Sequence, residues 1–321
     1  MSVANQLARI ERACDVRQLR LITPRSGPID LRDVIRYHVQ GIARSDLDGR
    51  AVLAFSVSGR EHGALWFARF ELASGRLAPE ARVDTVVRTQ LPHPGGMQAS
   101  GQLLAVACEG DKGYARVEIY DFEDLREPRD TLVLNNSLKE GVSQLTRSAA
   151  GWLTFAEASP GEYLLFVGGR SFAQREGWFY RYRPHAATRW EFLGPFTGMA
   201  DGAWGPQSGA AMVRANAESA LEMVTFGGKG PNGKDAYRTR VRCFGIDTAL
   251  PYKLLHQPPV LSFPGAKLKA DLKERFEPNV RWGSTAFMDG DALLTYFTAR
   301  NPRPDANEDH VLRIAEVRCR A

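Results

Sequence analysis

Seven side chains suited to binding a small molecule lie just ahead of five glycines that recur along the sequence. The glycines are Gly41, Gly96, Gly151, Gly209 and Gly283. The side chains are His38, His93, Arg147, Trp204, Gln207, Arg281 and Trp282. Aromatic surfaces beside a few directional polar groups are a usual lining of ligand pockets. The sequence therefore predicts a ligand-binding site if the fold brings these segments together. The alternative is that they are solvated loop tips and that the two tryptophans pack between structural repeats.

The same residues support a catalytic site less well than a binding site. In an enzyme, His93 and His38 could act as general bases or hold a metal. The candidate catalytic acids are Glu109 and Asp111, from the polar loop that follows the second strand of the same repeat as His93. His93 could equally hydrogen-bond within its own Pro-Gly-Gly turn, and no third ligand or partner carboxylate can be assigned. The sequence also has no G-x-S-x-G elbow, no H-E-x-x-H pair and no cysteine with an identifiable histidine partner. It assigns no catalytic residue.

One segment matches a phosphate-binding loop only in part. Residues Gly228–Lys234 satisfy the spacing G-x-x-x-x-G-K. The next residue is Asp235, where a Ser or Thr hydroxyl should hold magnesium, and a strand is predicted where a helix should begin. Because the helix N-terminal amides that cradle phosphate would be missing, we expect a hairpin here.

A second segment resembles a calcium loop, also in part. Asp305, Asn307 and Asp309 supply oxygens at alternate positions, and Glu316 stands at the twelfth position. However, His310 replaces the glycine that the sharp turn needs, and Glu316 should lie within a strand. We expect solvated loop acids, no metal and no cofactor, with a bound calcium ion as the weaker alternative.

The elements that would position these side chains repeat five times. Each repeat has a strand opened by one of the recurring glycines, a tight turn, a strongly apolar strand, a polar hairpin and an alternating aromatic strand. A shorter outer strand follows in the first four repeats. This pattern predicts an all-β, five-bladed β-propeller of four-stranded blades in a single domain, residues 1–321. The blades are expected at about 36–87, 93–136, 148–196, 207–262 and 281–321.

The last repeat lacks an outer strand, and the N-terminal region has a spare one. The chain ends at Ala321, soon after the third strand of the fifth repeat, whereas Gln18–Ile22 read as a strand before the first. We therefore expect a closing strand at about 16–23, which would leave no open sheet edge at this position. The longer fourth interval is predicted to contain a short helical insert near 266–276, because Leu268, Leu272 and Phe276 lie four residues apart.

Two phrases of the second repeat resemble blades of bacterial β-propeller proteins. They are His93-Pro-Gly-Gly-Met-Gln98 and Tyr120-Asp-Phe-Glu-Asp-Leu-Arg-Glu-Pro128. The resemblance extends over most of the chain through the other repeats. It implies the fold and is nearly silent on function, because propellers include hydrolases, lyases, lectins and scaffolds.

The predicted ring has two unequal faces. Long polar loops join the second and third strands, and the seven side chains of the first paragraph would meet the channel at that face, which we call the loop face. Those loops carry more cations than acids, which suggests an anionic ligand such as a carboxylate, a phosphate or an acidic sugar. The sequence thus favours a binding propeller for a small, anionic ligand or a protein partner. The alternative is a hydrolase or lyase of a sugar-like or anionic substrate, although Asp46 and Glu157 lie near the strand ends at the other face.

Composition excludes several classes of protein. The 321 residues are 44% hydrophobic and 25% charged, with a formal net charge of +5. The charge is modest and scattered, so we expect neither a nucleic-acid nor a membrane partner, and we expect a monomer. No apolar run approaches eighteen residues, and the first twenty lack a secretion signal. Without CxxC spacing the four cysteines (Cys14, Cys108, Cys243 and Cys319) read as reduced thiols. These features predict a soluble, cytoplasmic protein.

Overall fold

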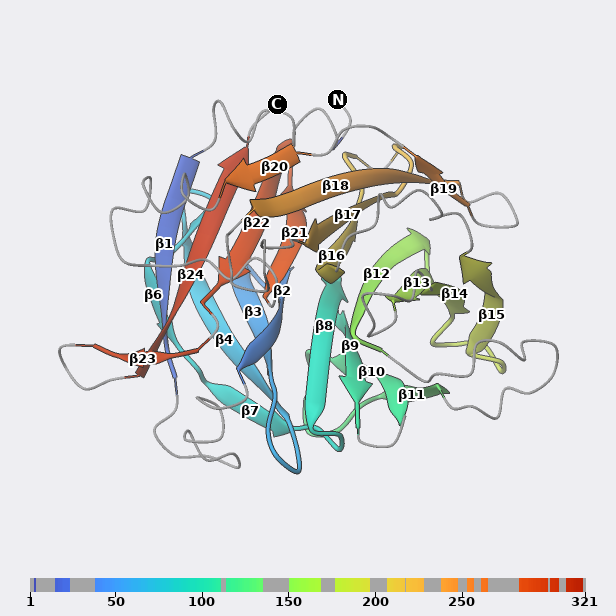
Figure 1. Ribbon diagram of the computed structural model, residues 1–321, viewed down its shortest axis with the longest axis horizontal. Coiled ribbons are helices and arrows are strands. Elements are labelled where there is room, and N and C mark those ends of the chain that lie inside the picture. Colours follow the sequence, from blue (N-terminus) through green and yellow to red (C-terminus); the bar gives the residue numbers. More distant parts are fainter. Residues whose placement is uncertain are drawn as a thin grey trace.

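The computed structural model describes residue 3 and most of the strands. The described ranges are 15–23, 38–110, 114–134, 150–168, 177–196, 207–216, 218–227, 238–247, 253–256, 261–264, 283–299, 301–305 and 310–319. Within them the chain forms five antiparallel sheets arranged in a ring (Figure 1). The predicted five-bladed β-propeller is confirmed. The predicted helical insert near 266–276 lies outside the described residues.

Blades 1 to 3 follow the predicted order of strands. Blade 1 contains β2 (Val39–Leu47), β3 (Arg50–Val57), β4 (Ala64–Ala73), β5 (Arg76–Leu77) and β7 (Thr85–Arg88). Blade 2 contains β8 (His93–Ser100), β9 (Leu103–Glu109), β10 (Ala115–Asp121) and β11 (Asp130–Leu134). Blade 3 contains β12 (Trp152–Ser159), β13 (Glu162–Gly168), β14 (Gly177–Tyr182) and β15 (Trp190–Phe196).

Blades 4 and 5 complete the ring. Blade 4 contains β16 (Gln207–Val213), β17 (Glu222–Gly227), β18 (Arg238–Asp247), β19 (Lys253–His256) and β20 (Leu261–Pro264). Blade 5 contains β21 (Ser284–Asp289), β22 (Ala292–Thr298), β23 (Arg303–Pro304) and β24 (His310–Cys319), with β1 (Asp15–Ile22) and β6 (Glu80–Arg82) beyond them.

The N-terminal strand closes the ring, as predicted. β1 pairs with β24 in an antiparallel register that runs from Asp15 opposite Arg318 to Ile22 opposite Val311. Figure 1 shows β1, in blue, beside β24, in red. β6, from the segment after blade 1, then adds to the far side of β1 in parallel. The edge that the last blade would have exposed is therefore covered by strands from elsewhere in the chain.

The first strands of the blades (β2, β8, β12, β16 and β21) surround the central channel. Each contacts the next, and β21 contacts β2 again. Glycine permits this close approach between blades 2 and 3. A Cβ atom on Gly95 would lie 2.5 Å from the Gly151 carbonyl oxygen, and one on Gly96 would lie 2.8 Å from the Trp152 Cα. Both distances are too short for any side chain, so these positions require glycine.

Five clusters of buried apolar side chains hold the described blades together, one between each pair of neighbours. Strands β3, β9 and β22 are buried along nearly their whole length because sheets cover both of their faces. Val3, from the N-terminal region, is fully buried in the cluster between blades 4 and 5. The core is thus a ring of apolar seams between neighbouring blades.

Two further findings concern the cysteines and the membrane. Cys108 and Cys243 are free thiols, but Cys319 is disulfide-bonded, so the expectation that all four cysteines are reduced is wrong. The described residues include no helix long and apolar enough to cross a membrane.

Candidate functional site

Gln98 links the first strands of three blades across the centre of the ring, and we call its side chain the channel plug. Its side chain comes from β8 and is 6% exposed. The amide nitrogen donates to the Met212 carbonyl at 2.6 Å, and the amide oxygen accepts from the Met212 N–H at 2.8 Å and from the Phe155 N–H at 2.9 Å. The channel-facing edge of a first strand has no neighbouring strand, so its polar groups need partners of this kind. One side chain therefore joins three blades.

A cavity of about 250 Å³ lies beside this plug, at the end of the channel where the first strands turn back. All five first strands contribute to its wall, and we call this end the hairpin face. The polar groups of the lining come from Arg44, Ser45, Gln98, Ser100, Glu157, Arg214 and Thr285. The apolar part includes Phe155, Met212, Phe287 and Met288. An apolar wall with a few polar groups is the composition expected of a small-ligand site.

Arg44 is the most enclosed charge of the cavity wall, with only 4% of its surface exposed. Its Nε and Nη2 donate to the two oxygens of Asp46, both at 2.8 Å, and its Nη1 donates to the Tyr296 hydroxyl. The guanidinium also lies over the Phe287 ring, 4.6 Å from its centroid. A guanidinium has five N–H donors, so these contacts leave two for another partner. Burial lowers the pKa of Arg44, but Tyr296 and Asp46 outweigh it and the pKa rises. Arg44 is a permanent cation.

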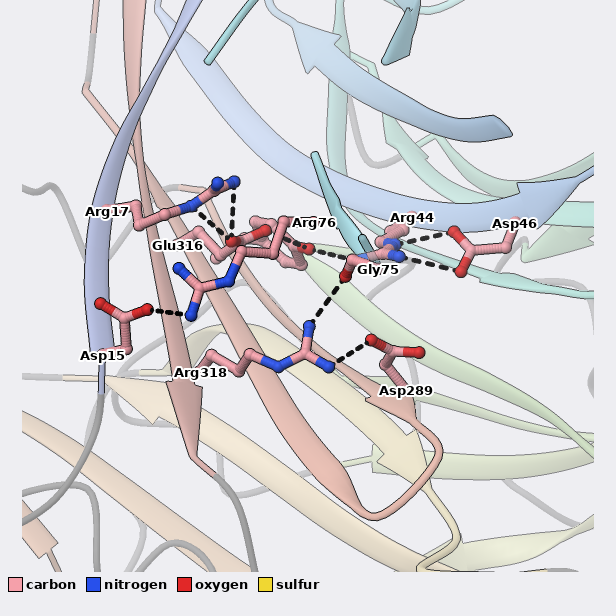
Figure 2. A network of polar contacts seen from close by, with 10 residues as sticks. Asp15, Arg17, Arg44, Asp46, Gly75, Arg76, Asp289, Glu316 and Arg318 are labelled. Atoms are coloured by element: carbon pink, nitrogen blue, oxygen red, sulfur yellow. Dashed lines mark hydrogen bonds and ion pairs between the residues drawn. The ribbon is translucent and has the colours of Figure 1, made fainter. Parts of the chain in front are cut away.

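A chain of buried contacts links Arg44 to the strand that closes the ring. The Tyr296 hydroxyl donates to Glu316 at 2.9 Å, and Glu316, 3% exposed, accepts from Arg17 at 3.1 Å. Arg17 in turn donates to the Leu77 carbonyl at 2.8 Å. Figure 2 shows Arg17 on the N-terminal strand pointing toward Glu316, and Arg44 clamped by Asp46. Burial and the charge of Glu316 raise the pKa of Tyr296, although Arg44 opposes them, so the hydroxyl stays protonated and can donate.

The other two charged side chains of the lining lie nearer to solvent. Arg214 donates from Nη2 to the Ala158 carbonyl at 2.8 Å. Glu157 is exposed, and its Oε1 accepts from the Gly161 N–H at 2.8 Å. With Arg44 already paired to Asp46, the two cations and two carboxylates around the cavity sum to no net charge. A ligand with two negative charges would therefore leave more charge uncompensated in the cavity than a ligand with one.

The described part of the loop face holds the two predicted histidines. His38 lies at the start of β2 with a φ of 82°, a conformation that a non-glycine residue adopts rarely. His93 begins β8 and stands opposite Glu109, which is 8% exposed. The ladders of β2, β8 and β16 are also irregular near this end. Bulges and strained backbone are common next to active and binding sites. They agree with a binding site at this face, which stays a prediction.

Nothing is described of the side chains of the remaining residues predicted for the loop face. Gln207 is the first residue of β16, and nothing is described of its side chain. Four other candidates for this face lie outside the described residues: Arg147, Trp204, Arg281 and Trp282, as does the candidate acid Asp111.

The calcium-like segment is described only in part. Asp305 pairs with Arg20 at 2.6 Å, while Asn307 and Asp309 lie outside the described residues. Glu316, the twelfth position of that motif, lies inside β24 and pairs with Arg17. In the described ranges no group of three or more His, Cys, Asp or Glu side chains could hold a metal.

The cavity residues carried a weak signal in the sequence. Arg44 follows Gly41-Ile-Ala on a predicted inner strand, with Asp46 two residues later on the same face. Gln98 ends the phrase that resembles a propeller blade, in a run otherwise of small and apolar residues. Polar side chains inside a buried strand indicate specific partners, and this observation could have located the hairpin-face cavity.

Comparisons with known proteins identify the fold only. No family model matches the sequence, and no curated protein matches it either. Among solved structures, a GH62 hydrolase in complex with xylotriose has a TM-score of 0.51 at 10% identity, over 94% of this chain and 97% of that one. A GH43_1 enzyme from Xanthomonas citri has a TM-score of 0.48 at 10% identity, over 97% and 93%. An alpha-L-arabinofuranosidase from Lactobacillus brevis has a TM-score of 0.47 at 13% identity, over 68% and 75%. At 10% identity the likeness to the GH62 hydrolase shows a shared fold alone.

Proposed function

We propose that this protein is a binding propeller that holds a small monocarboxylate in the cavity at the hairpin face. The observation that carries the proposal is the buried guanidinium of Arg44 in the cavity wall, with two N–H donors left after its contacts to Asp46 and Tyr296. Two N–H groups of a guanidinium match the two oxygens of a carboxylate. Phe287, against which Arg44 packs, supplies an apolar surface for the rest of the ligand.

Size and charge narrow the ligand class. At roughly 30 Å³ for each water, a cavity of about 250 Å³ holds about eight waters, so the ligand has on the order of eight to ten non-hydrogen atoms. The neutral balance of Arg44 and Arg214 against Asp46 and Glu157 favours a singly charged carboxylate over a phosphate dianion. A carboxylate is thus preferred to the other anions that the composition of the loops suggested.

Catalysis is the alternative. Glycosidases generally need two carboxyl groups about 5–10 Å apart around the scissile bond. Within the described lining Glu157 is the one carboxylate, since Asp46 is held in a bidentate contact with Arg44. This arrangement favours binding over bond cleavage. Turnover of any aryl glycoside by the protein, lost in Glu157→Gln, would support the alternative instead.

Calorimetric titration with a panel of small monocarboxylates, inorganic phosphate and neutral sugars tests the proposal. We expect one or more monocarboxylates to bind, and phosphate and neutral sugars to bind at least tenfold more weakly. Arg44→Lys keeps the charge but loses the planar fork, so it should weaken binding about tenfold or more. Arg183→Met, which removes a cation paired with Glu162 on blade 3, is the matched control and should bind as the unmodified protein does.

A second variant separates binding from stability. Tyr296→Phe removes the hydroxyl that occupies Nη1 of Arg44 and leaves the ring in place. It should bind the carboxylate at least as tightly as the unmodified protein, even where Arg44→Lys folds poorly. The proposal would be overturned if no monocarboxylate binds. It would also be overturned if Arg44→Lys binds every probe as tightly as the unmodified protein does.

A further inference from the structure

The apolar wall of the hairpin-face cavity is left uncovered at two side chains of one strand. Phe155, Met212 and Leu221 line the cavity but are each at most 2% exposed, so they offer it little side-chain surface. Phe287 and Met288, successive residues of β21, line it too and remain half-buried. Uncovered apolar surface in a concave site is where the body of a ligand packs. The apolar part of the ligand should therefore lie against β21.

These two side chains lie on opposite faces of β21, as successive residues of a strand do. Phe287 packs partly on the apolar cluster between blades 5 and 1, and Met288 packs partly on the cluster between blades 4 and 5. Each is thus supported by protein on one side and borders the cavity on the other. A ligand beside β21 meets an aromatic ring and a thioether together.

Arg44 sets the plane in which a carboxylate can bind. Its guanidinium carbon lies over the Phe287 ring, 4.6 Å from the ring centroid. A guanidinium and a carboxylate that share two parallel N–H···O bonds lie in one plane. In an aryl carboxylate the ring is conjugated with the carboxylate and lies close to that plane. A flat ligand of this kind extends the layer that the guanidinium already forms over Phe287, whereas a saturated ring is puckered and thicker than that layer.

The chemistry of the wall also distinguishes an aromatic ligand from an aliphatic one. Two aromatic rings attract each other beyond the effect of the area they bury. A methionine sulfur makes a favourable contact with the edge of an aromatic ring. Phe287 and Met288 can supply one contact of each kind. A single ring with its carboxylate also has the size that a cavity of about 250 Å³ admits.

We infer that the ligand of this cavity is an aromatic monocarboxylate with a single ring, such as benzoate or a close analogue. The inference rests on the proposed function, because it takes the carboxylate at Arg44 from there. Arg44 holds the carboxylate, and the ring packs on Phe287 and Met288. Small aliphatic carboxylates then bind the same site more weakly.

Calorimetric titration of the unmodified protein with benzoate and with cyclohexanecarboxylate tests the inference. The two probes have the same number of carbon atoms, and both are anions at pH 7. The saturated ring has the larger apolar surface, so hydrophobic burial alone favours cyclohexanecarboxylate. We expect the opposite order, with benzoate binding about fivefold or more tightly because of its contacts with the ring and the thioether.

The possible results of this titration separate the inference from the proposed function. Equal affinities, or tighter binding of cyclohexanecarboxylate, would overturn the inference and leave the proposed function in place. If neither probe binds and no other monocarboxylate does, the proposed function is wrong and the inference is wrong with it.

A leucine variant tests the part played by the aromatic wall. Phe287→Leu keeps an apolar side chain but removes the ring under Arg44, so the ratio of the two affinities should move toward one. Phe192→Leu, on the outer strand of blade 3 and 42% exposed, is the matched control and should keep the ratio of the unmodified protein. An unchanged ratio in Phe287→Leu would contradict the stacking on this residue.

Methionine methyl resonances locate the ring even where Phe287→Leu folds poorly. Benzoate at saturation should shift the methyl resonance of Met288 through the ring current of the bound ligand. It should leave unmoved the resonance of Met97, which is buried between blades 1 and 2. Cyclohexanecarboxylate has no ring current and should shift Met288 much less. Met288→Leu and Met97→Leu assign the two signals. A Met288 resonance that benzoate does not shift would overturn the placement of the ring.

Discussion

Blade 3 and blade 5 occupy similar places in the ring but are stabilised by different forces. Blade 3 is one continuous stretch of chain, and aromatic rings pack on its faces. The ring centroids of Phe155 and Tyr163 are 4.9 Å apart, and those of Phe166 and Phe179 are 4.7 Å apart. Blade 5 joins both ends of the chain and has a buried carboxylate, Glu316, between Arg17 and Tyr296.

The difference follows from how each blade obtains its register. A short hairpin sets the pairing of β12 with β13, so their side chains need only fill space. β1 has no hairpin to β24, so side-chain contacts must set its register, among them the alternation of buried Leu19 and Leu21 with more exposed neighbours. Arg17 stands directly opposite Glu316 in the ladder, and a shift of one residue would leave that carboxylate buried without its cation. Directional contacts thus replace chain connectivity.

The largest effect is expected from aromatic packing in blade 3. Phe166 is fully buried against Trp152 and Phe179. Phe166→Ala should lower the free energy of unfolding by about 4 kcal/mol, through lost burial and the space left behind. Phe192→Ala, on the same blade but 42% exposed, is the control and should change it by less than about 1 kcal/mol. Denaturant unfolding measures both, and equal losses would show that packing does not dominate this blade.

A slightly smaller effect is expected from the buried pair in blade 5. Arg17→Met leaves Glu316 charged and without its cation, which should cost about 3 kcal/mol of unfolding free energy. Arg183→Met removes a cation of half-exposed ion pairs with Glu162 and Glu191 on blade 3, and should cost less than about 1 kcal/mol.

A double variant identifies the cause of that loss. Arg17→Met combined with Glu316→Met removes the buried charge as well, so it should recover part of the stability lost in the single variant. No recovery would mean that packing of the Arg17 stem, rather than the unpaired carboxylate, accounts for the loss.

The ring itself was predictable, because repeated turns and alternating strands are local signals. The spare strand at Gln18–Ile22 and the missing outer strand of the last repeat predicted the closure that the β1–β24 ladder confirms. The buried charges were not predictable in the same way. Arg44, Tyr296, Glu316 and Arg17 come from four strands that only the closed ring brings together. The spacing of residues within one segment cannot predict such a contact. It cannot predict the cavity that Arg44 lines either.

The channel plug tests whether directional contacts are confined to blade 5. Gln98→Leu preserves approximate size but leaves the N–H and carbonyl of Met212 and the N–H of Phe155 without their partner. We expect a loss of about 2 kcal/mol, because water from the adjacent cavity can reach some of these groups. Gln102→Leu, in the exposed turn of the same blade, should change stability by less than about 0.5 kcal/mol. Equal effects of the two variants in urea unfolding would show that the plug adds nothing.

The smallest effect on stability is expected from the hydroxyl groups of the buried tyrosines, which act differently in the two blades. Burial raises the pKa of Tyr180, in blade 3, to about 12. Below pH 10 the hydroxyl is protonated in both the folded and unfolded states, so it adds no pH dependence. Above pH 10 the unfolded chain loses this proton first, and stability should fall until about pH 12, by about 1 kcal/mol at pH 11. Urea midpoints from pH 8 to 11, with tyrosinate absorbance, measure this decline.

The same substitution should therefore act differently in each blade. Tyr180→Phe should be nearly neutral at pH 7 and should reduce the decline above pH 10. Tyr296→Phe removes the donor to the buried Glu316 in blade 5, so it should cost about 1–2 kcal/mol already at pH 7. If the two variants lose the same stability at pH 7, the Tyr296 hydroxyl contributes only by filling space and not through its hydrogen bond. Directional contacts would then not be what sets the register of the closing strand.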